Sequence, residues 1–178
     1  SFGAKTYDEF MTSLDSLKSC GMKSLILDLE GNGGGYLNSA VEIASEFLDA
    51  AKLVVYTEGR ANPRYDNLSY GGDGFPKGNL AVIIDETSAS AAEILAGAIQ
   101  DWDRGVIVGR RSFGKGLVQR PFQLPDGSMI RLTIARYYTP SGRCIQKPYN
   151  DSINYDDDLM NRYNSGEMSS IDSIHFSD

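Results

Sequence analysis

The sequence predicts an α/β domain with a mixed sheet. Up to residue 108, segments with helical spacing alternate with short apolar runs, which is typical of parallel strands joined by helices. Residues 118–138 then form the pattern of a β-hairpin, whose strands pair antiparallel. The chain has 178 residues and is 41% hydrophobic, so it is long enough to bury a real core.

The first elements follow from local signals. Thr6 and Glu9 form a capping-box pattern, which predicts that Thr6 is the N-cap of a helix ending at Gly21. The run 24–29 predicts a buried strand and is followed by a glycine loop at residues 31–35. A helix over 37–48 and a strand over 52–57 come next.

The second half continues the alternation. Residues 59–79 are rich in Gly, Pro and Asn and predict a loop or a small hairpin. A strand is expected over 80–85, a helix of small residues over 90–100 and a strand over 106–108. The hairpin strands are expected at 118–124 and 129–138, around a turn at 125–128. Residues 150–178 predict a short polar helix and a tail.

Charge and composition exclude several classes. The formal net charge is −7, which argues against nucleic-acid binding, and much of the acidity lies after residue 150, as expected of a solvated surface. No run of 18 apolar residues predicts a membrane span, and no signal peptide is recognisable. Cys20 and Cys144 lack metal-ligand spacing and are expected to be free thiols. We expect an excised domain.

Ser90 is the candidate nucleophile. It lies in the segment T-S-A-S-A-A-E at the start of a predicted helix, where free N–H groups favour a developing oxyanion. The only histidine, His175, is three residues from the end of the sequence and poorly placed for a Ser-His-Asp triad. Lys115 is therefore the expected base. The structural alternative is that Ser88 or Ser90 only caps the helix, with support from Glu93.

Lys115 lies in a near-match to a phosphate loop, G-R-R-S-F-G-K-G. Gly116 supplies no hydroxyl for Mg²⁺, and the following residues are of β type and include Pro121, so a nucleotide site is not expected. Flanking by Phe113 and glycines suits a partly buried amine. Burial and the nearby arginines 110 and 111 would lower the pKa of Lys115, as a general base requires. The alternative is an exposed turn lysine.

The glycines at 33–35 follow a strand and precede a helix. Their backbone N–H groups predict an anion-binding nest that would supply an oxyanion donor, with a flexible turn as the alternative.

Three ordered segments, L-D-L-E-G-N-G-G-G-Y-L, I-D-E-T-S-A-S-A-A-E-I-L-A-G-A and G-R-R-S-F-G-K-G-L-V-Q, resemble the S41 family of C-terminal (tail-specific) processing peptidases across about residues 22–149. The resemblance implies a crotonase/Clp-like ββα core and a Ser/Lys endopeptidase. It implies that Ser90 is the nucleophile, Lys115 the base and Gln119 a support for the lysine amine. The oxyanion hole would be formed by the amides of Ala91 and of Gly34 or Gly35, between which the sequence does not choose.

The resemblance carries further expectations. Residues 1–149 would be the catalytic domain and 150–178 a polar, truncated segment, while the PDZ domain of the family, expected before Thr6, is missing from this chain. It implies a protein or peptide substrate, a periplasmic or cell-envelope location, and no metal or cofactor. Gly33 stands where the family commonly has proline, so the turn is expected to be looser.

Two geometric expectations remain. Four residues of strand span about 13 Å, so the chain should bend at Gly114 or Gly116 for Lys115 to reach Gln119, or the lysine should reach back. An extended substrate would add to a strand edge, either at 52–57 or on the hairpin at 118–138. The alternative functions are a non-catalytic peptide-binding module and an acyl-CoA enzyme, which shares the oxyanion hole but lacks a basic CoA site here.

Overall fold

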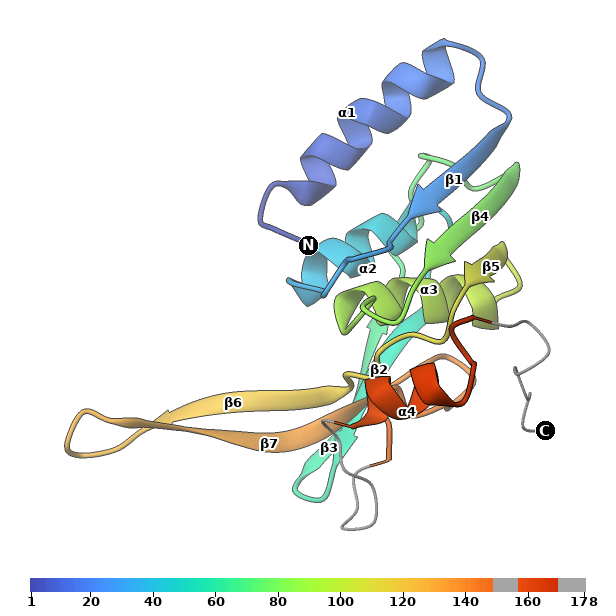
Figure 1. Cartoon of the computed structure of the whole chain (residues 1–178). Helices are drawn as coiled ribbons and strands as arrows, with labels where there is room; N and C mark the ends of the chain where they lie inside the picture. The colour runs from blue at the N-terminus through green and yellow to red at the C-terminus, as the bar shows by residue number, and fades with distance from the viewer. Residues whose placement is uncertain (149–156, 170–178) are drawn as a thin grey trace. The chain divides into compact units, whose positions relative to one another are not determined.

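Parallel and antiparallel strands are divided between two sheets in the computed structural model, which describes residues 1–148 and 157–169. The chain forms two units, Ser1–Gln146 and Lys147–Asp178. The elements of the first unit are α1 (Thr6–Ser19), β1 (Ser24–Asp28), α2 (Leu37–Ser45), β2 (Leu53–Gly59), β3 (Asn62–Leu68), β4 (Asn79–Ile84), α3 (Ala91–Asp101), β5 (Val106–Gly109), β6 (Leu117–Gln123) and β7 (Met129–Tyr138) (Figure 1).

The first sheet has the order β1-β4-β5 and is parallel, and the second has the order β3-β2-β7-β6 and is antiparallel. The predicted combination of parallel and antiparallel pairing is confirmed, with two sheets instead of one carrying it. The chain leaves the parallel sheet after β1 and returns to it at β4: β2, which follows α2, pairs instead with β3 and β7, so the two hairpins form the antiparallel sheet.

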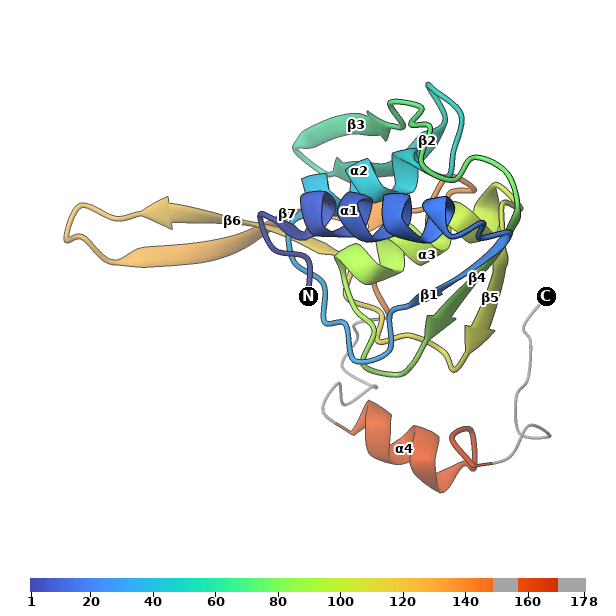
Figure 2. The same ribbon diagram turned by 90° about the horizontal axis from the view of Figure 1, so that it is seen from above.

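The helix α3 is the centre of this unit. It contacts β5 of the parallel sheet, β2 of the antiparallel sheet and the helix α2 (Figures 1 and 2). Its first nine residues are all buried, and five of them are alanine or glycine, which lets the neighbouring backbones approach closely. The largest fully buried apolar side chains come from α3 itself and from the segments around it: Leu14, Phe47, Val54, Val55, Val82, Ile94, Leu95 and Ile99.

The start of α1 differs from the expected capping box. The N-cap is Lys5, with no side-chain cap hydrogen bond, and Thr6 is the first helical residue. The Thr6 hydroxyl instead accepts a hydrogen bond at 2.8 Å from Gly3 N–H, a group that lies before the helix. The end of the helix is as predicted, since Gly21 has the left-handed φ of 82°.

The segment 59–79 combines both expected alternatives. Its first part is the strand β3, which forms a hairpin with β2, and residues 69–78 form a loop. The buried Glu46 holds this loop against α1, because it accepts hydrogen bonds from Gly74 N–H at 2.8 Å and from the Tyr7 hydroxyl at 2.7 Å. The hydrogen bond to Glu46, together with burial, raises the pKa of Tyr7 to about 12.

The second unit contains one described helix, α4 (Asp158–Asn164), which confirms the predicted short polar helix. An ion pair of 3.0 Å joins Lys147 to Asp158 within this unit. The rest of the predicted tail, including His175, lies outside the described residues. Within the described ranges, no helix combines the length and apolar character needed to traverse a bilayer.

Candidate active site

Ser90 occupies a strained turn at the N-terminus of α3. It is the N-cap residue, with φ 56° and ψ −115°, a conformation that non-glycine residues rarely adopt. The turn between β4 and α3, residues 85–90, is called the serine turn below. A strained serine between a strand and a helix is typical of nucleophiles, because the turn presents the hydroxyl and leaves the following amide facing the same side.

Asp85 braces the serine turn. Its carboxylate accepts hydrogen bonds from Thr87 N–H at 3.0 Å, from Ser88 N–H at 2.9 Å and from Gly31 N–H of the glycine loop at 3.1 Å. Burial alone would raise the pKa of Asp85, but the hydrogen bonds from Thr87, Gly31 and Ser88 outweigh it and lower the pKa to about 2. The fully buried Ser88 hydroxyl adds a bond of 2.7 Å to Leu29 C=O. The turn is therefore fixed to the end of β1.

Glu93 joins the serine turn to the segment that carries Lys115. This segment, residues 110–116, is called the lysine loop below. Glu93 is only 7% exposed, and its two oxygens accept four hydrogen bonds. The donors are Ser90 N–H at 2.8 Å, Ser112 Oγ at 2.7 Å, Gly114 N–H at 2.7 Å and Lys115 N–H at 2.8 Å. A buried carboxylate with four donors is fully satisfied, so it clamps both segments.

The lysine loop contains a left-handed residue, Gly114, with φ 85°, and β6 begins at Leu117. The chain bends at Arg110, and the bend expected at Gly114 or Gly116 is not found. Phe113 N–H also donates to Ser88 C=O at 3.0 Å, which docks the loop directly on the serine turn. A strand and not a helix follows Lys115, as the β-type residues predicted, so the helix that a phosphate loop requires is not formed there.

The expectation that Lys115 is partly buried is wrong. The residue is exposed, because the clamp acts on its backbone while the side chain extends from a loop, and Gln119 on β6 is exposed as well. In the described part of the chain, no side-chain hydrogen bond joins Lys115 to Ser90 or to Gln119. The structure thus brings the backbones of the two predicted catalytic residues together.

The glycine loop lies against Ser90. A Cβ atom on Gly34 would come within 2.7 Å of Ser90 Cβ and 3.0 Å of Ala91 N, so only glycine fits there. Gly34 N–H is engaged, donating to Asn32 Oδ1 at 3.0 Å. Its C=O accepts from Phe2 N–H at 2.9 Å, and Tyr36 N–H donates to Phe2 C=O at 2.9 Å. Phe2 therefore pairs with the loop at Gly35.

Asn32 is a second residue whose importance the sequence did not indicate. Its side-chain Oδ1 accepts a hydrogen bond from Gly34 N–H, and its backbone C=O accepts one from Ala89 N–H at 2.9 Å. Asn32 therefore links the glycine loop to the residue before Ser90. Glu93 was expected only as a capping partner. The spacing of Glu93 from Ser90 was the one signal in the sequence that pointed to it. Nothing in the sequence indicated its contacts with the lysine loop.

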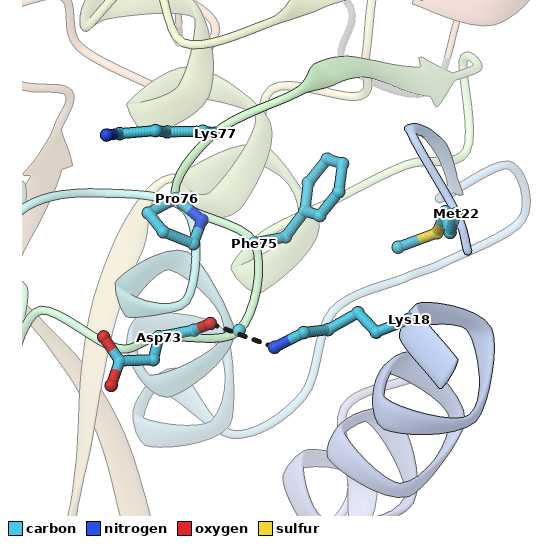
Figure 3. A pocket seen from close by; sticks show the side chains of 7 residues that line it. Lys18, Met22, Asp73, Phe75, Pro76 and Lys77 are labelled. Carbon is cyan, nitrogen blue, oxygen red and sulfur yellow. Dashed lines mark hydrogen bonds between the residues drawn. The ribbon is translucent and has the colours of Figure 1, made fainter. Parts of the chain in front are cut away.

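A surface pocket of about 300 Å³ lies elsewhere, at the end of α1 (Figure 3). Lys18 crosses it and donates to Asp73 C=O at 3.1 Å. Its other lining residues are Met22 and residues 74–77, none of which belongs to the predicted site. Cys20 and Cys144 are both free and exposed, as expected.

Known proteins that resemble this chain are processing proteases. The carboxyl-terminal-processing protease of Picosynechococcus sp. is 40% identical over 146 residues, covering 82% of this chain and 35% of the relative. The carboxy-terminal processing protease CtpB of Bacillus subtilis is 36% identical over 148 residues, covering 82% of this chain and 30% of the relative. The chain thus spans about a third of the length of these relatives.

A solved structure confirms the expected fold. The photosystem II D1 C-terminal processing protease matches with a TM-score of 0.77 and 35% identity, over 82% of this chain and 37% of that one. The sequence model of peptidase family S41 matches residues 1–156, a longer stretch than the three motifs alone covered. The chain belongs to peptidase family S41.

Proposed function

We propose that this chain is the catalytic domain of a serine endopeptidase that processes protein substrates, with Ser90 as nucleophile and Lys115 as general base. The observation that carries the proposal is the Glu93 clamp, which holds the backbone of a strained serine and that of a lysine on one carboxylate. Family membership supports the same reaction class, and the relatives above are named as carboxyl-terminal processing proteases.

The proposed reaction has two halves. Ser90 Oγ attacks the carbonyl carbon of a peptide bond, and its proton passes to the Lys115 amine. The tetrahedral oxyanion accepts hydrogen bonds from Ala91 N–H and from a glycine-loop amide. Collapse of the intermediate breaks the C–N bond, and the leaving amine takes the proton from Lys115. Water then attacks the acyl-enzyme, again losing a proton to Lys115, which returns it to Ser90.

Two supporting groups belong to the proposal. Gly35 is the better donor for the oxyanion hole, because Gly34 N–H is already bonded to Asn32. Gln119 would orient the lysine amine after rotation of the exposed Lys115 side chain. For the longer protein we propose a periplasmic or cell-envelope location and a PDZ domain outside residues 1–149.

The test compares cleavage of an unfolded protein substrate by the full-length protein and its Ser90→Ala and Lys115→Ala variants. We expect each variant to lose at least about 10³-fold in kcat/KM, as removal of a nucleophile or its base does. Ser13→Ala and Lys23→Ala, which change exposed residues, are the matched controls and should retain wild-type rates. If both site variants cleave as fast as wild type, the dyad is wrong.

The alternative of a non-catalytic peptide-binding module is separated by labelling. A fluorophosphonate reagent should modify Ser90 of the wild-type protein stoichiometrically and leave Ser90→Ala unmodified. A protein that binds unfolded substrate but shows neither labelling nor cleavage would be such a module.

A further inference from the structure

Among the strands that the structure describes, none pairs with the outer edge of β6, which begins beside the predicted base. β6 is the last strand in the order β3-β2-β7-β6, and Leu117, its first residue, is two positions after Lys115. The other strand expected to accept a substrate, β2, is paired with β3 on one side and, from Tyr56 to Glu58, with β7 on the other. Its Val54 and Val55 are fully buried, so β6 is the more accessible strand. The two views show the β6–β7 hairpin extending away from the helices of its unit (Figures 1 and 2).

Two hydrogen bonds determine which backbone groups face this edge. At the tip, Leu124 N–H donates to Ser128 C=O at 2.8 Å, and at the base, Tyr137 N–H donates to Gly116 C=O at 2.8 Å. Bonded and non-bonded pairs alternate along an antiparallel ladder. The register shift after Val118 places the extra residue, Ile134, on β7, so both ends give the same alternation along β6. The residues whose N–H and C=O groups point away from β7 are therefore Leu117, Gln119, Pro121 and Gln123.

Pro121 divides the open edge into two parts. It has no N–H group, so an added strand would find an acceptor there but no donor. Leu117 and Gln119, on the side of the predicted site, offer both. A proline at an outward-facing position is a common device against unwanted strand pairing. The edge is thus protected toward the tip and usable next to Lys115.

The two faces of the hairpin have different chemistry. The opposed pairs Arg120/Leu132 and Phe122/Ile130 lie on one face, and the three apolar members are 39–47% exposed. The other face carries Gln119, Gln123 and Arg131, together with the exposed Met129. A two-stranded ribbon exposed on both faces is marginally stable alone, so a third strand would stabilise it.

The charge of this region is opposite to that of the chain. Residues 115–138 contain four cationic side chains, Lys115 and the arginines 120, 131 and 136, and one acidic side chain, Asp126, in a protein with a net charge of −7. Such a local excess of positive charge favours an acidic partner segment.

We propose that an extended segment of the polypeptide substrate adds to β6 as a further strand, pairing with Leu117 and Gln119, with apolar side chains on the Phe122/Leu132 face and acidic side chains on the Arg131 face. This inference rests on the proposed function, because it extends the substrate from Ser90 along the strand that follows Lys115. Backbone pairing gives affinity that tolerates many sequences, and the two faces give the preference for alternating apolar and acidic residues.

The first experiment leaves the protein fold untouched. A fluorescein-labelled ten-residue peptide, in which leucine alternates with glutamate and serine, is titrated with the full-length Ser90→Ala protein by fluorescence anisotropy. Two further peptides carry N-methyl groups on every second residue, one on the leucines and one on the intervening residues. We expect one N-methylated peptide to bind at least tenfold more weakly and the other within threefold of the parent. Equal effects of the two sets, or no effect, would overturn the proposal.

The second experiment changes one face at a time. Leu132→Ser should weaken peptide binding about fivefold, whereas the matched variant Met129→Ser, on the other face, should stay within twofold. If instead both variants bind alike and sedimentation shows that Leu132→Ser dissociates a dimer, a second copy occupies the edge and the proposal is wrong. Cleavage by wild type with no such binding pattern would leave the proposed function standing and reject this inference alone.

Discussion

The backbone N–H groups of Ser90 and Lys115 donate to the same atom, Oε2 of Glu93, at 2.8 Å each. Residues 25 positions apart in the sequence are thereby fixed relative to one another through a single side chain. These two bonds use only the backbone groups of Ser90 and Lys115 and neither of their side chains. The bond from Lys115 N–H to Glu93 also fixes the backbone position from which the exposed lysine side chain extends.

Glu93→Gln should disconnect the two segments. The amide has nearly the shape of the carboxylate but presents N–H donors, and all four partners of Glu93 are donors. We expect kcat/KM to fall at least tenfold. The free energy of unfolding should fall by about 2–4 kcal/mol, because buried donors lose a charged acceptor. Urea denaturation and fluorophosphonate labelling rates measure the two effects. Glu9→Gln on exposed α1 should change neither, and wild-type labelling by Glu93→Gln would refute the clamp's role in positioning.

The glycines at 33 and 34 provide a matched pair. An alanine Cβ at Gly34 would overlap Ser90 Cβ, and Gly34 has the left-handed φ of 96°, whereas nothing lies within 4 Å of a Cβ at Gly33. Gly34→Ala should therefore lower kcat at least about 10²-fold by displacing the glycine loop and the oxyanion donor proposed for it. Gly33→Ala should keep wild-type activity. Steady-state kinetics of both variants decides the matter, and equal activities would contradict the packing of the glycine loop on Ser90.

The Asp85 carboxyl should make stability pH-dependent in acid. Its pKa is lowered to about 2 in the folded protein, against about 3.9 in an unfolded chain. Its contribution is therefore complete above the unfolded value and is lost as the pH falls from about 4 toward 2. Urea unfolding of wild type and Asp85→Asn should show a stability difference that shrinks over this window. Asp15→Asn on exposed α1 is the control, and a difference that stayed constant with pH would argue against the bracing role.

The strained backbone of Ser90 should be visible as a cost in stability. Glycine tolerates φ 56° and ψ −115°, whereas alanine keeps the strain, so Ser90→Gly should exceed Ser90→Ala in free energy of unfolding by about 1 kcal/mol. Both variants should lack activity, which separates stability from function. Thermal and urea unfolding of the two proteins provides the measurement, and a less stable glycine variant would show that the turn is unstrained.

Local patterns were sufficient for most of the elements. The periodicity of α1, the turn at 125–128 and the small residues of α3 each identify a structure within one segment of sequence. The motifs around Ser90 and Lys115 also gave the order of the site. The capping box predicted for α1 was wrong, because Thr6 hydrogen-bonds to Gly3 and the N-cap is Lys5.

The contacts between segments could not be read from the sequence. Glu93 reaches Ser112, Gly114 and Lys115 only after α3 and β5 have packed, so its position beside Ser90 suggested nothing beyond a helix cap. The exposure of Lys115 has the same origin. Neighbouring glycines are compatible with burial or with exposure of a lysine, and in the structure Gly114 supplies a left-handed residue next to an exposed Lys115.

The pairing of Phe2 with the glycine loop connects the residues before α1 to the turn that carries Ser90. Two backbone hydrogen bonds of 2.9 Å connect Phe2 to Gly34 and Tyr36, the residues on either side of Gly35. A segment that precedes Ser1 in a longer protein would be connected, through these two bonds, to the loop that lies on Ser90. A displacement of that segment would reach the glycine loop, and with it the proposed oxyanion hole, without any change in the residues of the site itself.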